Sequence, residues 1–338
     1  MYGPDHSFLG VPAADPDDAR QWAQAGAALI GAPFDGGTSH RAGCRFGPQA
    51  MRAADYLPHD GSRPSLALGV DALIDLGVVD LGDVEMPSGD VERSLAALEE
   101  RVRAVAAAGV VPIILGGDHT IALPDVRAVA RHVGWGRVAV IHFDAHADTG
   151  DTQWGSLYGH GTPMRRLIES GACRGDRFLQ IGLRGYWPEP ETLAWMAEQG
   201  MRSFEMAEVV ARGLDAVLDE ALAIASDDCD AVFLSIDVDV VDPGAAPGTG
   251  TPEPGGLTSR QLLDAVRRIA MEAPLAGMDV VEVSPPYDHA DITAYLGNRV
   301  VLEALGGMAW RAKRRRGDAV RRPSDPLLGR DSDGAAAT

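Results

Sequence analysis

Residues 138–148 read Val-Ala-Val-Ile-His-Phe-Asp-Ala-His-Ala-Asp, an apolar run that passes directly into the pattern Asp-x-His-x-Asp. The apolar part predicts a buried strand, and alternate residues of a strand point to the same side. Asp144, His146 and Asp148 are therefore expected to converge where that strand ends. Open α/β sheets bind ligands at this carboxyl end of their strands. The segment predicts a sheet with a polar site along one edge.

Five other short apolar runs, ending in glycine or acidic residues, predict the rest of the sheet. They cover residues 28–32, 110–115, 177–181, 231–236 and 275–281. Helical periodicity between them covers residues 91–108, 123–132, 191–198, 214–224 and 259–271. Gly109 is placed to end the first of these helices, and Thr258 or Ser259 to cap the last. The alternation predicts a three-layer α/β/α fold around a mainly parallel sheet.

The chain is expected to form one domain with a flanking segment on each side. No repeat and no linker-like composition interrupts residues 27–310, and 46% hydrophobic content is ample for one core. We expect an N-terminal arm over residues 1–27 and a single domain over residues 28–310. From residue 311 onward, arginine, proline, serine and glycine replace the apolar periodicity, which predicts a disordered, solvated tail.

Composition excludes several classes of partner. The formal net charge of −19 disfavours nucleic acid and anionic membranes and favours a small cationic ligand. No apolar run is long enough to span a bilayer, and the N-terminus lacks the basic start and apolar core of a secretory signal. Three cysteines without a paired spacing are typical of reduced thiols, so a cytoplasmic location is expected.

Two further strand ends carry potential metal ligands. Asp237 and Asp239 follow residues 231–236, and His119 follows residues 110–115 after a glycine pair. Each residue alone has a simple structural explanation, such as helix capping or a satisfied polar contact. Together the explanation fails, because four clustered carboxylates repel one another unless cations lie between them. The candidate ligands are His119, Asp144, His146, Asp148, Asp237 and Asp239.

Imidazole and carboxylate ligands without a thiolate suit hard ions such as Mn²⁺ better than a structural zinc. Two divalent ions would neutralise the four carboxylates, and a water shared by paired metals becomes a nucleophile near neutral pH. A metal-dependent hydrolase is therefore predicted. His142, inside the strand, is expected to be a hydrogen-bonded core residue, and Asp118 and Asp242 to support the neighbouring ligands.

Three ordered segments resemble the signatures of the ureohydrolases, the arginase and agmatinase family: residues 116–119, 143–148 and 235–243. Residues 31–38, 45–48, 160–163 and 282–289 look specifically agmatinase-like. The resemblance covers about residues 28–308 and implies an arginase-like fold, homotrimers or homohexamers, and hydrolysis of a guanidino compound to urea and an amine.

The resemblance also implies a role for each site residue. One Mn²⁺ would be held by His119, Asp144, Asp148 and Asp237, and the other by Asp144, His146, Asp237 and Asp239. Asp148 would hydrogen-bond the hydroxide between the ions, Glu282 would grip the guanidinium, and His160 would shuttle a proton to the departing amine. Because some relatives prefer Ni²⁺, Ni²⁺ is the alternative metal for this site.

The substrate tail is expected to lie against residues 150–159. Arginases carry an asparagine where this chain has Gly150, which counts against arginine. Trp154 and Tyr158 would cover an aliphatic chain, and Asp151 would attract a terminal ammonium. Agmatine, converted to putrescine and urea in polyamine biosynthesis, is therefore predicted. Guanidinobutyrase, guanidinopropionase and other guanidino-acid activities stay open, since Arg41 or Arg184 could meet a carboxylate.

Two alternatives come from other classes. An amide deacetylase of the arginase fold would use one zinc ion, so metal stoichiometry distinguishes it. A non-catalytic metal-binding subunit would bind two ions and release no urea from any guanidino compound.

Overall fold

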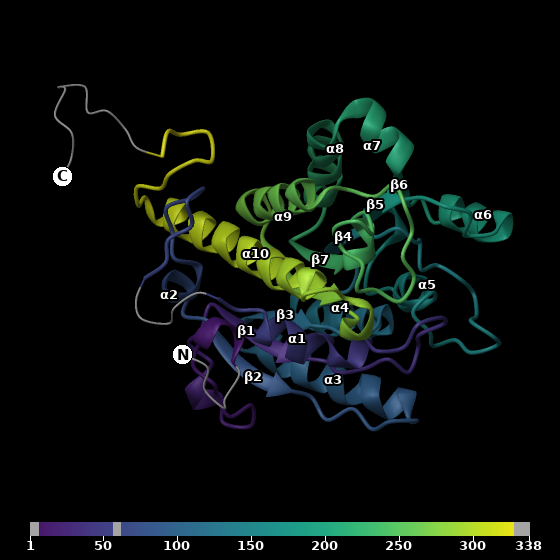
Figure 1. Ribbon diagram of the computed structural model, residues 1–338, viewed down its shortest axis with the longest axis horizontal. Coiled ribbons are helices and arrows are strands. Elements are labelled where there is room, and N and C mark those ends of the chain that lie inside the picture. Colours follow the sequence, from purple (N-terminus) through teal and green to yellow (C-terminus); the bar gives the residue numbers. More distant parts are fainter. Residues whose placement is uncertain (1–6, 57–61, 328–338) are drawn as a thin grey trace.

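The computed structural model describes residues 7–56 and 62–327 and is built around one parallel sheet of eight strands (Figure 1). The strand order is β2-β1-β3-β8-β7-β4-β5-β6. The strands are β1 (Ala27–Gly31), β2 (Val79–Asp83), β3 (Val111–Leu115), β4 (Val138–Phe143), β5 (Phe178–Leu183), β6 (Arg202–Glu205), β7 (Ala231–Asp237) and β8 (Leu275–Val281). Every neighbouring pair runs parallel, so all carboxyl ends meet at one edge.

All six predicted strands are present, with bounds that differ from the prediction by at most two residues. The two outer strands, β2 and β6, were not predicted. Their sequences, Val-Asp-Leu-Gly-Asp and Arg-Ser-Phe-Glu, mix charged with apolar residues. An outer strand pairs on one side only and faces water on the other, so it tolerates charges that a central strand excludes.

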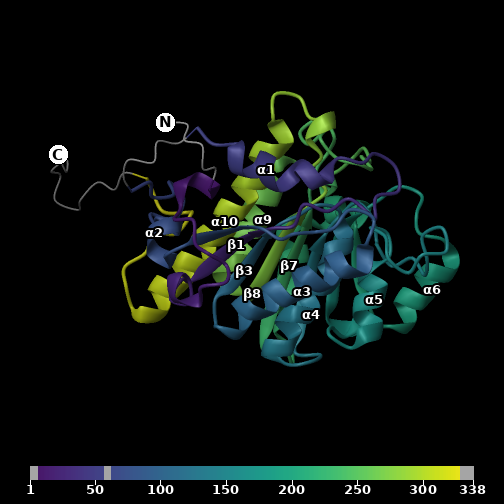
Figure 2. The same ribbon diagram turned by 90° about the horizontal axis from the view of Figure 1, so that it is seen from below.

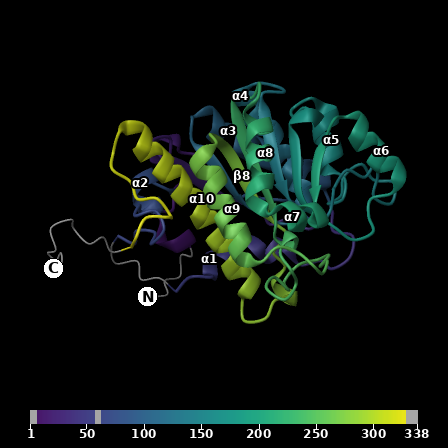
Figure 3. The same ribbon diagram turned by 90° about the horizontal axis from the view of Figure 1, so that it is seen from above.

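Helices cover both faces of the sheet (Figures 2 and 3). One face carries α3 (Val91–Ala107), α4 (Ala122–Val133) and α5 (Pro163–Ser170), and the other α1 (Gly47–Ala53), α8 (Leu214–Ser226), α9 (Ser259–Glu272) and α10 (Ile292–Arg316). The short helices α2 (Ala72–Leu76) and α7 (Met206–Arg212) contact α10 and α8, and α6 (Pro190–Glu198) lies near the β6 end. The predicted three-layer α/β/α architecture is confirmed.

The connections between these elements contain short 3-10 helices. They are η1 (Phe8–Gly10), η2 (Ala19–Gln21), η3 (Cys44–Phe46), η4 (His119–Ile121), η5 (Gly175–Arg177), η6 (Val238–Val240) and η7 (Pro285–Tyr287). The predicted helix ends are also found. Thr258 forms a reciprocal capping box with Gln261 at the start of α9, and Gly109, with φ +77°, follows the end of α3.

The hydrophobic core lies on both faces of the sheet, because the central strands are buried on both sides. In β4, Ile141 and Phe143 belong to the apolar cluster under α8–α10, while Val138 and Val140 belong to the cluster under α3–α5. This alternation holds the strand rigidly in register. Its polar carboxyl end is thereby fixed in space.

The structure corrects the expected start of the C-terminal tail. Helix α10 continues to Arg316, six residues beyond the predicted boundary at residue 310. Trp310 is buried and its indole N–H donates to the carbonyl oxygen of Arg321 at 2.7 Å. The basic residues in the last turn complement the negative C-terminal end of the helix dipole. Residues 328–338 of the predicted tail lie outside the described residues.

The predicted N-terminal arm packs onto the body of the protein. Phe8, Leu9 and Val11 are buried, and the Phe8 N–H donates to Asp80 Oδ2 at 2.9 Å. Residues 1–6 lie outside the described part. Within residues 7–56 and 62–327, no helix is both apolar enough and long enough to cross a bilayer.

Candidate metal centre

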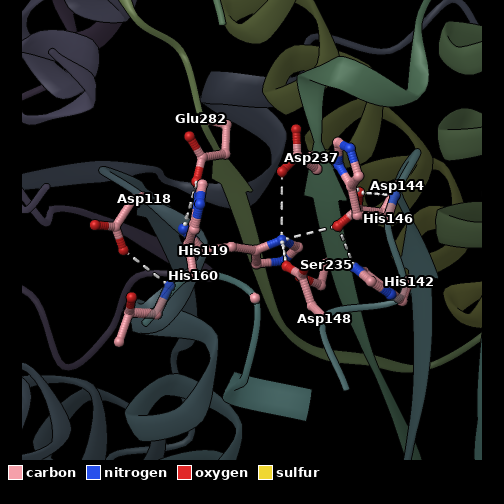
Figure 4. Close-up of polar contacts among 12 residues, drawn as sticks. Asp118, His119, His142, Asp144, His146, Asp148, His160, Ser235, Asp237 and Glu282 are labelled. Carbon is pink, nitrogen blue, oxygen red and sulfur yellow. Dashed lines mark hydrogen bonds and ion pairs between the residues drawn. The ribbon is translucent and has the colours of Figure 1, made fainter. Parts of the chain in front are cut away.

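The predicted ligands converge because four adjacent strands end at one place. In the order β3, β8, β7 and β4, these strands lead to His119, Glu282, Asp237 and Asp144. Figure 4 shows the side chains of His119, Asp237 and Asp144 pointing toward one another, with Glu282 beside them next to His160. Asp148, four residues beyond Asp144, adopts φ +54°, a left-handed conformation that is rare outside glycine. Such strain persists where the surrounding structure imposes it, often at functional sites.

His119 stands in the middle of the carboxylates. Its Nδ1 lies 3.0 Å from Asp144 Oδ2, 3.0 Å from Asp148 Oδ2 and 3.4 Å from Asp237 Oδ2. All four residues are buried. One nitrogen atom therefore faces three carboxylate oxygens from two other strand ends.

The second half of the cluster surrounds His146. Its Nδ1 lies 3.0 Å from Asp239 Oδ2 and 3.5 Å from Asp144 Oδ1. The two oxygens of Asp144 thus face different histidines, one in each half. The Asp239 N–H donates to Asp237 Oδ1 at 2.8 Å, which orients that carboxylate.

Burial and mutual charge shift the pKa values of these groups strongly. Burial and the charges of Asp239 and Asp144 hold the pKa of Asp237 well above its usual range. Burial opposes the charged form of His119, yet the carboxylates of Asp144, Asp148 and Asp237 close to its Nδ1 outweigh burial and raise its pKa well above normal. The site therefore gathers like charges that protons, or bound cations, must compensate.

The proton position on His119 shows that the residues fit a metal ion. Ser235 Oγ donates to Asp279 Oδ1 at 2.7 Å and is 2.9 Å from His119 Nε2, so it accepts a hydrogen bond from the N–H of that ring nitrogen. In the neutral ring, the form that can bind a metal, the lone pair of His119 is then on Nδ1, a buried atom without a hydrogen-bond partner among the described residues. An acceptor facing three carboxylate acceptors is stable only with a cation between them.

His142 was expected to be a hydrogen-bonded core residue, and the structure confirms that it is buried and hydrogen-bonded. Gln180 Nε2 lies 3.2 Å from His142 Nδ1 and also donates to the Ala147 carbonyl at 2.7 Å. Ser203 Oγ donates to Gln180 Oε1 at 2.9 Å, which fixes the amide orientation. His142 Nδ1 therefore accepts, and Nε2–H donates to Asp144 Oδ2 at 2.8 Å.

This hydrogen-bond chain decides between two uses of His142. The ring lies close enough to His119, Asp144 and Asp148 to join a metal-binding group with them. However, its cluster-facing nitrogen carries the proton and has no lone pair for a metal. His142 thus orients Asp144 instead of competing with it for the ion.

His160 and Glu282 form a buried pair beside the carboxylates. His160 Nδ1 lies 2.8 Å from Glu282 Oε1. Burial alone would lower the pKa of His160, but the charge of Glu282 and their hydrogen bond outweigh it and raise the pKa to about 9. Glu282 has φ +63° directly after β8, a second left-handed residue at the edge of the sheet.

Cys44 is a site residue that the sequence did not reveal. Its Sγ donates to Glu282 Oε2 at 3.0 Å, while the His119 N–H donates to Glu282 Oε1 at 3.0 Å. Burial and the charge of Glu282 hold the pKa of Cys44 well above its usual range, so the thiol keeps its proton. The two residues are 238 positions apart, and no local pattern marked this cysteine.

Asp118 supports the site through the loop before η3, as expected. It accepts hydrogen bonds from the Gly37 N–H at 2.7 Å and the Thr120 N–H at 3.0 Å. The same loop carries Ser39, another residue that the sequence did not reveal. Ser39 Oγ lies 2.6 Å from His160 Nε2.

Asp242, the other residue expected to support a ligand, caps a turn. Its carboxylate accepts from the Gly244 N–H at 2.9 Å and the Gly255 N–H at 2.8 Å. It therefore holds the loop after η6, on which Thr251 lies.

A cavity of about 580 Å³ opens over the cluster. It is lined by Ser39, His146, Asp148, Gly150, Asp151, Thr152, Gln153, Trp154, His160, Gly161, Thr162, Trp187, Glu189, Glu191, Thr192, Asp237 and Thr251. The predicted Asp151 and Trp154 are among them. Tyr158 is not, because its side chain packs against the apolar cluster under α3–α5. Glu282 is also absent from the lining and contacts the cavity residue His160.

The outer part of the cavity is acidic. Asp151, Glu189 and Glu191 line it, and no lysine or arginine does so within the described part of the chain. The two arginines considered for a substrate carboxylate are engaged elsewhere. Arg184 donates to the carbonyl oxygens of Asp239 and Glu253 at 2.6 and 2.5 Å, and the guanidinium of Arg41 lies 5.2 Å from the Tyr287 ring centroid.

Comparisons with known proteins agree with this geometry. Residues 25–306 match the model of the arginase family. The chain is 41% identical to guanidinopropionase of Pseudomonas aeruginosa over 309 residues, covering 91% of this chain and 93% of that protein. It is 39% identical to the mitochondrial agmatinase of Gallus gallus over 281 residues, covering 82% and 80% of the two chains.

The fold has close counterparts among solved structures. Proclavaminate amidino hydrolase from Streptomyces clavuligerus superposes with a TM-score of 0.82 at 34% identity, covering 92% of this chain and 99% of that one.

Proposed function

The chain belongs to the arginase family, and from that premise we propose that it hydrolyses agmatine to putrescine and urea. The reaction class is common to its relatives: hydrolysis of a C–N bond in a linear guanidino compound. The choice of agmatine is ours and rests on the charge of the cavity.

Agmatine carries a cation at each end, and the cavity offers carboxylates at both ends. The metal cluster lies at the bottom, and Asp151, Glu189 and Glu191 line the outer part. A guanidino acid would place its own carboxylate among these three without a cationic side chain on the lining. Like charges in a partly desolvated cavity cost binding free energy, whereas an ammonium gains it.

Two bound divalent ions would neutralise the four carboxylates and lower the pKa of a shared water, which is the chemistry they supply. His119, Asp144, His146, Asp148, Asp237 and Asp239 would hold them, and their donor types favour Mn²⁺ with Ni²⁺ as the other candidate. Asp148, on the cavity floor, would orient the attacking water. His160 would protonate the departing amine.

Glu282 is proposed to bind the guanidinium through its second oxygen. The Oε2 atom has the Cys44 thiol as its hydrogen-bond partner and lies next to Gly250, where an added Cβ would be 3.4 Å away. The carbonyl oxygen of Arg41 lies on the same side of Gly250. A carboxylate and a carbonyl around an open glycine suit a planar group with several N–H donors.

A guanidino-acid substrate is the second candidate, because the chain is 41% identical to a guanidinopropionase. Arg166 Nη2 lies 3.3 Å from Asp151 Oδ1 and neutralises part of the outer charge. Identity over the whole chain does not single out the cavity lining, so we take the charge of the lining as the more direct indicator of the substrate tail.

The test is a urea-release assay with agmatine, 4-guanidinobutyrate, 3-guanidinopropionate and arginine, in Mn²⁺ and then in Ni²⁺. We expect the highest kcat/KM for agmatine. Glu191→Gln should lower kcat/KM for agmatine at least about threefold and spare the guanidino acids. Glu198→Gln, on the same helix but outside the cavity, is the matched control.

Other outcomes would identify a different function. A higher kcat/KM for a guanidino acid would contradict the agmatine proposal and keep the reaction class. Two bound metals without urea from any compound would indicate a non-catalytic subunit, and one bound Zn²⁺ a deacetylase-like site. The same proposal includes a cytoplasmic location, a role in polyamine biosynthesis, and a trimeric or hexameric assembly. Cell fractionation tests the location, and sedimentation tests the oligomeric state.

A further inference from the structure

Ser39, His160 and Glu282 form a continuous hydrogen-bonded chain beside the metal cluster. Ser39 Oγ is 2.6 Å from His160 Nε2, and His160 Nδ1 is 2.8 Å from Glu282 Oε1. Figure 4 shows His160 and Glu282 next to each other at the side of the ligand cluster. Both ring nitrogens of His160 are therefore occupied by protein atoms.

Backbone geometry fixes where the protons lie in this chain. In the neutral form of His160, the form that accepts a proton, the Ser39 N–H donates to Nε2 at 3.0 Å, so the lone pair of the ring is on that nitrogen. Nδ1 then carries the ring proton and donates it to Glu282. Neither nitrogen is free to meet a substrate in this arrangement. Ser39 and His160 both line the cavity, and the Ser39 hydroxyl is the cavity-lining group in contact with Nε2.

We propose that Ser39 is a further catalytic residue of the proposed reaction, whose hydroxyl carries protons between the cavity and His160 Nε2. This inference rests on the proposed function, because it needs a departing amine that takes up a proton. It gives the chain a serine–histidine–glutamate relay in which the serine is a proton carrier and forms no covalent bond.

The proton balance of the relay closes in both directions. When the cavity delivers a proton, Oγ accepts it and passes its own proton to Nε2, leaving an imidazolium that Glu282 stabilises. When the amine departs, Nε2–H returns a proton to Oγ while Oγ–H gives one to the amine nitrogen. The hydroxyl gains and loses one proton each time and stays neutral.

The two loops that carry the relay are held together before any substrate arrives. The His160 N–H donates to the Gly37 carbonyl at 3.0 Å, and Gln153 Nε2 donates to the same oxygen at 2.7 Å. A Cβ at Gly37 would lie 2.0 Å from Thr120 Oγ1, so only glycine allows this approach. Preorganised donors and acceptors are what proton transfer in a transition state requires.

Ser39→Ala isolates the hydroxyl, because alanine keeps the backbone N–H that donates to His160. We expect kcat to fall at least about tenfold while KM changes less than about twofold and bound metal is unchanged. Ser39→Thr keeps a hydroxyl and should restore most of kcat. Ser226→Ala, the same change on exposed α8, should behave as wild type.

A double-mutant cycle with His160→Ala separates a relay from an independent structural effect. If protons pass through His160, Ser39→Ala should add almost nothing to the loss already caused by His160→Ala. Equal kcat in wild type and Ser39→Ala, additive losses in the cycle, or a threonine variant as slow as the alanine variant would each overturn the relay.

The cycle is measured with the guanidino compound that the wild-type protein hydrolyses best. A wrong substrate assignment then changes which compound is used, whereas a wrong relay leaves the wild type and Ser39→Ala equally active. If the wild type releases no urea from any compound, the proposed function fails, and with it the relay that depends on a departing amine.

Discussion

At the residue scale, hydrogen-bond partners decide what each histidine does. His119 and His142 both lie at the cluster and are both fully buried. Ser235 accepts a hydrogen bond from His119 Nε2, so in the neutral ring the Nδ1 lone pair faces the carboxylates. Gln180 donates to His142 Nδ1, so the Nε2 atom that faces Asp144 carries the proton. One ring can therefore bind a cation, and the other can only hold a ligand in place.

Replacing Gln180 tests the role of this hydrogen-bond chain. Gln180→Leu removes the donor to His142 and frees the ring to turn its lone pair toward Asp144. We expect metal affinity to fall about 10–100-fold with the fold intact, measured by metal titration of chelated protein. Gln49→Leu, at an exposed position of α1, is the control. Unchanged metal affinity in Gln180→Leu would show that Asp144 needs no such support.

Substitutions of Asp144 and His160 should affect metal content and turnover differently. Asp144→Ala removes the carboxylate that faces both halves of the cluster, so bound metal and turnover should both be lost. His160→Ala should keep the metal content of the wild type and lower kcat about 100-fold or more. Elemental analysis of each purified variant together with the urea assay checks both. Two metals and full activity in Asp144→Ala would refute the ligand assignment.

At the element scale, tight turns after the strands bring the ligands together. Between β3 and His119 the backbone of the chain contacts the backbone of Phe34. A Cβ at Gly117 would lie 1.8 Å from the Phe34 carbonyl oxygen. The Asp118 N–H donates to that same oxygen at 2.8 Å. The short connection therefore requires glycine because two backbones touch.

Gly117→Ala should thus lower the free energy of unfolding by about 2 kcal/mol or more, since backbone on both sides must move. Gly306→Ala is the matched control: in α10 its Cβ would meet Leu68 Cδ1 at an ordinary 3.6 Å. Alanine is the better helix former there, so the control should be neutral or more stable by up to about 1 kcal/mol. Denaturant unfolding measures both, and equal effects in the two variants would contradict the steric account.

At the scale of the whole molecule, the buried cluster couples metal binding to folding. In the metal-free protein, burial and neighbouring carboxylates raise the pKa of Asp237, and carboxylate partners raise the pKa of His119 against the effect of burial. A raised folded-state pKa means that the folded chain binds the proton more tightly than the unfolded chain. This stabilisation is lost as the pH rises toward the raised pKa.

The metal-free protein should therefore have a higher Tm at about pH 6 than at about pH 8, while Mn²⁺ should raise Tm most at about pH 8, where protons compete least. Thermal unfolding in chelator and in excess Mn²⁺ measures both trends. A metal-free Tm that increases from the lower to the higher pH would contradict the protonation account of the cluster.

Local sequence patterns were sufficient to predict the central sheet and to place the candidate ligands at one edge of it. Buried parallel strands read as continuous apolar runs, so β4 and β8 were predicted with their observed bounds. Asp144, His146 and Asp148 lie on one short segment, and strand alternation alone places them together. The outer strands β2 and β6 were not predicted, because their charged residues interrupt the continuous apolar run that marks a buried strand.

Only the tertiary structure decided how the candidate ligands are supported and which residues line the cavity. Cys44 meets Glu282, Ser39 meets His160 and Gln180 meets His142 across separations of 238, 121 and 38 residues. Periodicity reports the face on which a residue lies, but a contact between distant loops depends on how the layers pack. The sequence thus determined the sheet and the candidate ligands at its edge, whereas packing determined the hydrogen-bond partners of those residues and the acidic lining of the cavity.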